Sequence, residues 1–189
     1  MNYILTPQIT TFAYFAWWDN IFEEHELNYL QGLTKRASKE ATVGAGLVSE
    51  IRRTKVDWLD CSDETRWIYD KFATVVSSLN ASYFNLDLTG FGEPMQLTNY
   101  LSDDSGMYEW HCDNGPGISR KLSIVLQLSH PEEYEGGELQ IKTGVDEDII
   151  PKKRGYITVF PSYILHRVTP VTKGTRQTMV SWVTGPRFK

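Results

Sequence analysis

The sequence contains only two cysteines, Cys61 and Cys112, and no Cys-x-x-Cys pair. Two thiols are too few for a disulfide framework, so a reducing cytoplasm is the expected location. The chain also lacks a run of about 18 apolar residues, the length that a membrane-spanning helix needs. Its first residues do not combine a basic start with an apolar core, so no signal peptide is expected.

Positive charge is also scarce, because 19 Lys and Arg stand against 24 Asp and Glu, for a net charge of −5. Surfaces for nucleic acid or for anionic membranes need clustered positive charge. The one basic cluster, at 152–154, lies just before Gly155 and is typical of a solvated turn. We therefore expect no nucleic-acid partner and no membrane partner.

The length of 189 residues predicts a single domain over 1–189 with room for a buried core. Residues 1–92 are expected to supply supporting helices and N-terminal strands. Aromatic residues in 1–18 indicate a short strand. Apolar residues at helical spacing predict helices over 21–40, capped by Asp19 or Asn20, and over 63–84, capped by Ser62. The Gly-containing segment 42–58 leads into a strand and could be either a mobile lid or a simple connector.

From residue 93 the apolar residues alternate with a period of two, and turn residues interrupt the pattern at short intervals. This pattern predicts a barrel core over 93–185 with strands at 95–101, 107–113, 121–129, 137–142, 156–160, 163–169 and 176–184. Two helices followed by about seven strands favour an α+β, mainly β, fold. We expect the helices to pack on one sheet of an antiparallel sandwich or barrel.

The first candidate site is the stretch 108–114, Tyr-Glu-Trp-His-Cys-Asp-Asn. In a strand, residues two apart point to the same face, so His111 and Asp113 would project side by side. An imidazole and a carboxylate on one face can chelate a divalent first-row metal. On its own the pair is a weak signal, because a surface histidine next to a turn aspartate gives the same pattern. Strict alternation would place Cys112 on the opposite face.

A second imidazole, His166, enters a late strand, and Arg176 follows ten residues later. With His111 and Asp113, His166 completes two imidazoles and one carboxylate, the set typical of non-haem Fe(II) oxygenases. Alternation places Arg176, Thr178, Val180 and Trp182 on one face of the last strand. An inward arginine needs an anionic partner, and the distal carboxylate of a metal-chelating 2-oxoacid would supply one. Zinc can take the same ligands.

These motifs resemble the Fe(II)/2-oxoglutarate-dependent dioxygenases, within them the prolyl 4-hydroxylase-like group, and most closely the bacterial and phage PKHD-type hydroxylases. The similarity covers about 95–185. It includes the stretches 108–114, 122–129, 134–139 and, most specifically, 155–182. The family has a double-stranded β-helix (jelly-roll, cupin-like) barrel, so this resemblance implies the same barrel here.

The resemblance implies Fe(II), 2-oxoglutarate and O2 as cofactors, with ascorbate as a reductant. It also implies hydroxylation of a C–H bond, with a prolyl residue of a peptide or protein as the substrate and succinate and CO2 as coproducts. Position by position, it assigns iron to His111, Asp113 and His166, and 2-oxoglutarate to Arg176 and Tyr100, with Thr178 beside them. It assigns substrate contacts to Arg120, Trp182 and, more faintly, Arg53.

Several alternatives stay open at this point. Tyr108 and Trp110 could join Trp182 in an aromatic wall against a prolyl ring, or they could be barrel packing. Gln127 stands where several prolyl hydroxylases carry Tyr. A catalytically silent barrel that binds a ligand or partner, a hydroxylase of a free amino acid or small molecule, and a zinc hydrolase are the rival functions.

Overall fold

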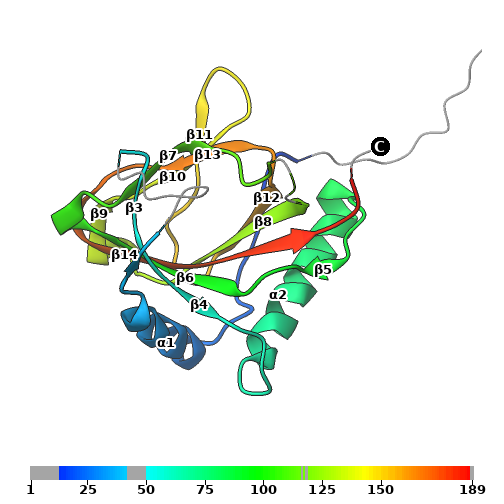
Figure 1. Ribbon diagram of the computed structural model, residues 1–189, viewed down its shortest axis with the longest axis horizontal. Helices are drawn as coiled ribbons and strands as arrows, with labels where there is room; N and C mark the ends of the chain where they lie inside the picture. The colour runs from blue at the N-terminus through cyan, green and yellow to red at the C-terminus, as the bar shows by residue number, and fades with distance from the viewer. Residues whose placement is uncertain (1–12, 42–49, 116, 118, 188–189) are drawn as a thin grey trace, which may run out of the picture.

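The computed structural model describes residues 13–41, 50–115, 117 and 119–187. Two antiparallel sheets face each other in a jelly-roll, and two α-helices cover the outer side of one of them (Figure 1). The predicted mainly β barrel with helices packed on one sheet is confirmed. No helix in these ranges is long and apolar enough to cross a membrane.

The larger sheet has the order β1-β12-β8-β14-β6-β4-β2, with β5 and β9 also paired to β14. The strand bounds are β1 Ala16–Trp18, β2 Lys39–Glu40, β4 Lys55–Leu59, β5 Gly90–Phe91, β6 Met95–Leu101, β8 Arg120–Gln127, β9 Tyr134–Gly136, β12 Ile157–Pro161 and β14 Val171–Thr184. Strand β14 pairs with β6 on one side and β8 on the other, so it runs through the middle of the sheet.

The smaller sheet has the order β11-β10-β13-β7-β3 and lies across the barrel from the larger one (Figure 1). Its strands are β3 Arg52–Arg53, β7 Met107–His111, β10 Leu139–Lys142, β11 Glu147–Ile149 and β13 Leu165–Val168. Strands β7 and β13 are neighbours, and their pairing is irregular between His166 and Val168. The irregularity adjoins the pair of His166 with His111.

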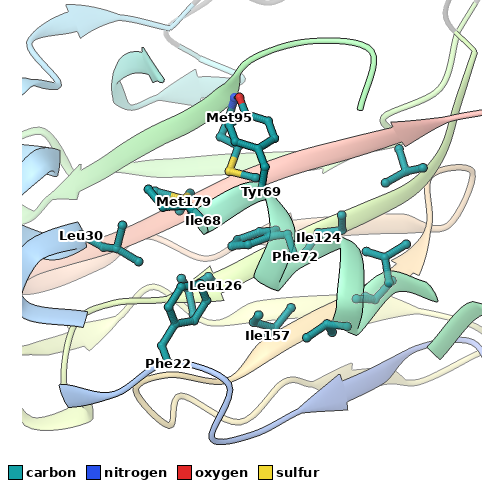
Figure 2. Packing of buried hydrophobic residues seen from close by; sticks show 14 of the residues in the cluster. Phe22, Leu30, Ile68, Tyr69, Phe72, Met95, Ile124, Leu126, Ile157 and Met179 are labelled. Atoms are coloured by element: carbon teal, nitrogen blue, oxygen red, sulfur yellow. The ribbon is translucent and has the colours of Figure 1, made fainter. Parts of the chain in front are cut away.

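Helices α1 (Glu24–Leu33) and α2 (Arg66–Leu79) pack their apolar sides on the larger sheet (Figures 1 and 2). Phe72 and Leu30 from the helices are fully buried, as are Ile124, Leu126 and Met179 from β8 and β14. A second apolar cluster lies between the two sheets and contains Phe160, Ile141 and Val171. The helix-facing core and the barrel interior are therefore separate clusters on opposite faces of the same sheet.

The predicted helix bounds were too wide. Helix α1 begins after Glu23, whose N–H donates to the Glu26 carboxylate, so neither Asp19 nor Asn20 caps it. It ends at Leu33 in a short 3-10 turn, Thr34–Arg36. Helix α2 begins after Thr65, three residues beyond Ser62, and continues as a π turn over Asn80–Phe84. Of the predicted N-terminal strand and of the segment 42–58, residues 1–12 and 42–49 lie outside the described residues.

The last strand is longer than the predicted 176–184, because residues 171–175 also belong to β14. Gly174 has a φ of 70°, and a Cβ there would lie 2.0 Å from the carbonyl oxygen of Glu133. A glycine therefore marks the close approach of β9, which pairs with this part of β14. Gly174 therefore reflects this close strand pairing, in which the register shifts between Val171 and Lys173.

Candidate metal and cosubstrate site

The three predicted metal ligands meet at one end of the smaller sheet. His111 ends β7, Asp113 follows it by two residues, and His166 lies opposite His111 on β13. One ligand atom from each residue lies within 4.8 Å of the others. The Asp113 carboxylate lies 3.7 Å from Nε2 of His111 and 3.5 Å from Nε2 of His166.

Backbone carbonyls orient both imidazoles toward the carboxylate. Nδ1 of His111 lies 2.7 Å from the carbonyl oxygen of Glu109, and Nδ1 of His166 lies 2.9 Å from that of Ile164. A carbonyl oxygen only accepts, so each Nδ1 carries the proton and each Nε2 keeps its lone pair. Both lone pairs are therefore available to a metal ion beside Asp113.

The Asp113 carboxylate has a polar support of its own. Its Oδ2 accepts a 2.6 Å hydrogen bond from Ser123 Oγ, which lies 3.0 Å from Ser162 Oγ. The backbone N–H of Asp113 donates to the carbonyl oxygen of Ser162. Burial alone would raise the pKa of Asp113, but the charges of His166 and His111 and the Ser123 hydrogen bond lower it. The carboxylate is thus held ionised.

His111 is held neutral for a different reason. The pKa of its imidazole is lowered to about 3, first by burial and then by the charge of His166, although Asp113 and the Glu109 carbonyl act in the opposite direction. Two imidazole Nε2 atoms and one carboxylate suit a divalent first-row ion and leave coordination positions open for other ligands. The donor set of this chain therefore fits Fe(II).

A bulge in β7 changes which neighbours of His111 face the metal. The Tyr108 ring stacks on the His111 imidazole, with centroids 3.4 Å apart and planes 14° apart, and both residues line the cavity. Cys112, expected on the opposite face, also borders the cavity. Of the two alternatives left open for Trp110, the structure favours packing: it is not among the cavity residues, and its ring lies against Arg167 and Lys142. Strict alternation fails here because the register shifts between β7 and β13.

A cavity of about 670 Å³ opens beside the triad between the two sheets. Arg176, Thr178, Val180 and Trp182 all line it, as the alternation of β14 predicts. Tyr100, expected near the cosubstrate, lines it from β6, opposite Arg176 in the register. The Arg176 guanidinium lies 5.4 Å from the Tyr100 ring centroid.

Arg176 is buried at 3% exposure without a counter-ion. All 24 Asp and Glu side chains of the chain lie within the described ranges, and none of them forms an ion pair with Arg176. An unpaired buried guanidinium is unfavourable, so this end of the cavity calls for an anionic ligand. A carboxylate is well suited, because the planar fork of arginine binds it at two points.

Sequence reasoning missed a tyrosine next to Arg176. The Tyr134 hydroxyl is buried without a hydrogen-bond partner among the described residues. Burial raises the pKa of this phenol, while the charge of Arg176 lowers it. Gln127, whose role was left open, lies nearby but donates to the carbonyl oxygen of Ser129. Tyr134 lies within reach of Arg176 and Gln127, which also lower its pKa, so its hydroxyl is placed to bind an anion together with Arg176. In the sequence its position before Gly136-Gly137 is the signal for it.

Of the residues predicted to contact substrate, Arg120 and Trp182 line the cavity and Arg53 does not. Arg120 and Trp182 lie together at the cavity, with the guanidinium carbon 3.8 Å from the indole centroid. The Glu93 carboxylate receives two 2.6 Å hydrogen bonds from Arg120, an ion pair that the sequence did not suggest. Arg53 is not among the cavity residues and donates to the carbonyl oxygen of Ser105, whereas its neighbour Arg52 lines the cavity.

Comparison with known proteins identifies the segment that carries this site. Residues 95–184 match the family model described as the 2OG-Fe(II) oxygenase superfamily. This segment is similar to the 2OG-Fe(II) oxygenases. The resemblance found in the sequence is confirmed, and the family implies Fe(II), 2-oxoglutarate and O2, which the His-Asp-His set fits.

The curated proteins that this segment resembles are PKHD-type hydroxylases. One from Hyphomonas neptunium is 42% identical over 102 residues, which cover 49% of this chain and 46% of the relative. One from Gloeothece citriformis is 45% identical over 80 residues, covering 40% of this chain and 36% of the relative. The chain thus matches less than half of the length of these relatives.

Solved structures share the fold along nearly the whole chain. A Pseudomonas putida prolyl-4-hydroxylase superposes with a TM-score of 0.76 at 19% identity, covering 90% of this chain and 92% of that one. A Trichoplax adhaerens prolyl hydroxylase, in complex with a hypoxia inducible factor peptide fragment, gives 0.78 at 16% identity and covers 91% and 84%. At these identities the likeness establishes the jelly-roll fold.

Proposed function

We propose that the chain is an Fe(II)- and 2-oxoglutarate-dependent hydroxylase that acts on a prolyl residue of a peptide or protein. One observation carries the proposal: the metal-ligand triad and the unpaired, buried Arg176 line the same cavity. A zinc hydrolase would use the triad but would have no need for a buried guanidinium beyond it.

Each group of the chain then has a binding task. His111, His166 and Asp113 would hold the ion, and Arg176 with the hydroxyl of Tyr134 would hold the distal carboxylate of 2-oxoglutarate. Tyr100 and Thr178 line the same cavity. The Thr178 hydroxyl is buried without a partner among the described residues and is a further donor for the cosubstrate.

The chemistry supplied by the bound cofactors is oxidative decarboxylation of 2-oxoglutarate to succinate and CO2, coupled to hydroxylation of a substrate C–H bond. The protein contributes orientation and exclusion of water. Val125, Leu139 and Val168 line the cavity with apolar surface, which limits water near the reacting carbon. We assign no general base, since the cofactors carry the chemistry.

The aromatic side chains support a prolyl substrate. Tyr108 and Trp182 line the cavity, and Trp58 lies 6.3 Å from Trp182, so aromatic surfaces border the cavity near the metal ligands. A pyrrolidine ring is compact and apolar and packs well against such surfaces. Two of the fold relatives are described as prolyl hydroxylases, one of them in complex with a peptide.

The test is turnover of 2-oxoglutarate by the purified chain with Fe(II) and O2, with succinate as the readout. His111→Ala and Asp113→Ala should abolish succinate formation, whereas His25→Ala, at an exposed histidine on α1, should not. Proline-containing peptides should gain about 16 Da, the mass of one oxygen atom. Binding of metal and peptide without succinate would indicate the silent barrel. Zinc in anaerobically purified protein, with peptide hydrolysis, would indicate the hydrolase.

A further inference from the structure

We propose that Arg52 is a carboxylate-binding residue, so that the substrate carries a carboxylate beside the carbon that is hydroxylated. The inference rests on the proposed function and narrows its substrate class. It differs from the sequence-based expectation, which pointed to Arg53. The carboxylate that Arg52 binds would be an Asp or Glu side chain of a peptide, or the free carboxylate of an amino acid.

Arg52 lies on β3, directly opposite Tyr108 in the register of the smaller sheet. Its guanidinium carbon lies 4.6 Å from the centroid of the Tyr108 ring, which in turn stacks on His111. Arg52 is therefore one aromatic ring away from a metal ligand. A group bound to it would lie in the same cavity as the metal ligands, about one aromatic ring farther from the metal centre.

The Arg52 guanidinium has hydrogen-bonding capacity that the described residues do not use. Nη2 of Arg52 donates to the side-chain oxygen of Gln96, which is neutral. The Nε–H is buried and has no partner among the described residues. No Asp or Glu side chain forms an ion pair with Arg52, although every one of them lies in the described ranges. A partly buried guanidinium with free N–H groups favours an anion, and a carboxylate matches its planar fork.

Several of the other charged side chains at the cavity are already paired. Arg120 is neutralised by Glu93 through two short hydrogen bonds, and Glu40 is paired with Lys55. Lys39 borders the same cavity and, like Arg52, forms no ion pair in the described part of the chain. Asp113 also lines the cavity, but its negative charge would be bound to the metal ion. Apart from Asp113 and from Arg176 at the cosubstrate end, the unpaired charges are those of Arg52 and Lys39, and both are positive. These charges would favour an acidic substrate over a neutral one.

The test compares ligand pairs that differ only in a carboxylate. Binding to the full chain with Fe(II) and 2-oxoglutarate is measured by calorimetry without O2, so that no turnover occurs. The peptide arm uses end-capped hexapeptide pools with one central proline, flanked by Asp/Glu in one pool and Asn/Gln in the other. The amino-acid arm uses L-proline and L-prolinamide. The arms distinguish a side-chain carboxylate from a free one.

In at least one arm the carboxylate ligand should bind about tenfold more tightly or better, as expected for a charge-assisted hydrogen bond. Arg52→Gln should remove the preference and Arg52→Lys should reduce it, because lysine keeps the charge but loses the fork. Arg66→Gln removes one positive charge from an exposed site on α2 and should keep the preference.

Equal affinities within both pairs would overturn the inference, as would a preference that survives Arg52→Gln. Absence of binding by both carboxylate ligands up to about 1 mM would also count against it. Unchanged 2-oxoglutarate affinity shows that Arg52→Gln is folded. A carboxylate preference without any succinate formation would leave the inference standing and remove the hydroxylase proposal, so the two failures are distinguishable.

Discussion

The ring of Tyr108 lies nearly parallel to the imidazole of His111, with the two centroids 3.4 Å apart. The stack fixes the plane of a metal ligand that a backbone carbonyl already orients through Nδ1. It exists because the strand bulges, so that residues three apart in the sequence face the same cavity.

Removing this ring should loosen the metal ligand. We expect Tyr108→Ala to weaken Fe(II) binding about tenfold, in the range found for groups that support metal-bound histidines. Tyr108→Phe should retain the affinity of the wild type, because the contact is made by the ring and not by the hydroxyl. Anaerobic Fe(II) titration measures both. Equal affinities for Tyr108→Ala and the wild type would show that the stack does not position His111.

The Ser123 hydroxyl should have a similar effect through the carboxylate. Ser123→Ala removes the 2.6 Å hydrogen bond to Asp113 and should weaken Fe(II) binding by about 10- to 100-fold. Ser181→Ala is the matched control: Ser181 is as fully buried on the neighbouring strand, but its hydroxyl has no partner among the described residues. Similar losses in both variants would argue against a role for Ser123 in metal binding.

The cosubstrate end of the cavity can be tested without touching the metal. Arg176→Ala should raise the 2-oxoglutarate concentration needed for binding by 10-fold or more, since a charge-assisted bidentate contact is lost. Tyr134→Phe should cause a smaller increase. Fe(II) affinity should stay unchanged in both, and Tyr156→Phe, at a tyrosine outside the cavity lining, should bind 2-oxoglutarate as the wild type does. Unaltered affinity in Arg176→Ala would remove the cosubstrate assignment.

The pair between Glu93 and Arg120 should contribute to stability as well as to the shape of the cavity. Both side chains are mostly buried, and the contact is bidentate. Glu93→Gln is expected to lower the free energy of unfolding by about 1–3 kcal/mol. A double-mutant cycle with Arg120→Gln in urea unfolding measures the coupling. Additive effects would mean that the two residues act independently.

Acid should destabilise the metal-free protein through His111. Its pKa in the folded state, about 3, lies below the ordinary value of 6.5. Between these values the unfolded state binds more protons, so the free energy of unfolding rises with pH across this window and falls on acidification. His111→Gln should flatten this dependence, whereas His25→Gln, at an exposed site, should not. Chemical denaturation between about pH 4 and 7 provides the measurement.

Local patterns predicted the features that depend on neighbouring residues. The alternation along 176–182 placed Arg176, Thr178 and Trp182 on one face, and the structure places all three at the cavity. The spacing of His111 and Asp113 likewise predicted two groups that meet.

Local patterns could not predict features that depend on residues far apart in the sequence. Arg52 faces the cavity where Arg53 was expected, because the pairing of the two-residue β3 with β7 decides the side, and a strand that short shows no periodicity. Glu93 lies 27 residues before Arg120, and nothing in the local sequence of either residue predicts their ion pair.

Strand β14 separates two kinds of side chain along its length. Arg176, Thr178, Val180 and Trp182 point into the barrel, while Met179 and Val183 belong to the core beneath the helices. Substitutions on one side can therefore remodel what the barrel accepts and leave the helix-facing packing in place. A library restricted to Thr178 and Val180 is thus a practical route to altered ligand preference in a chain that still folds.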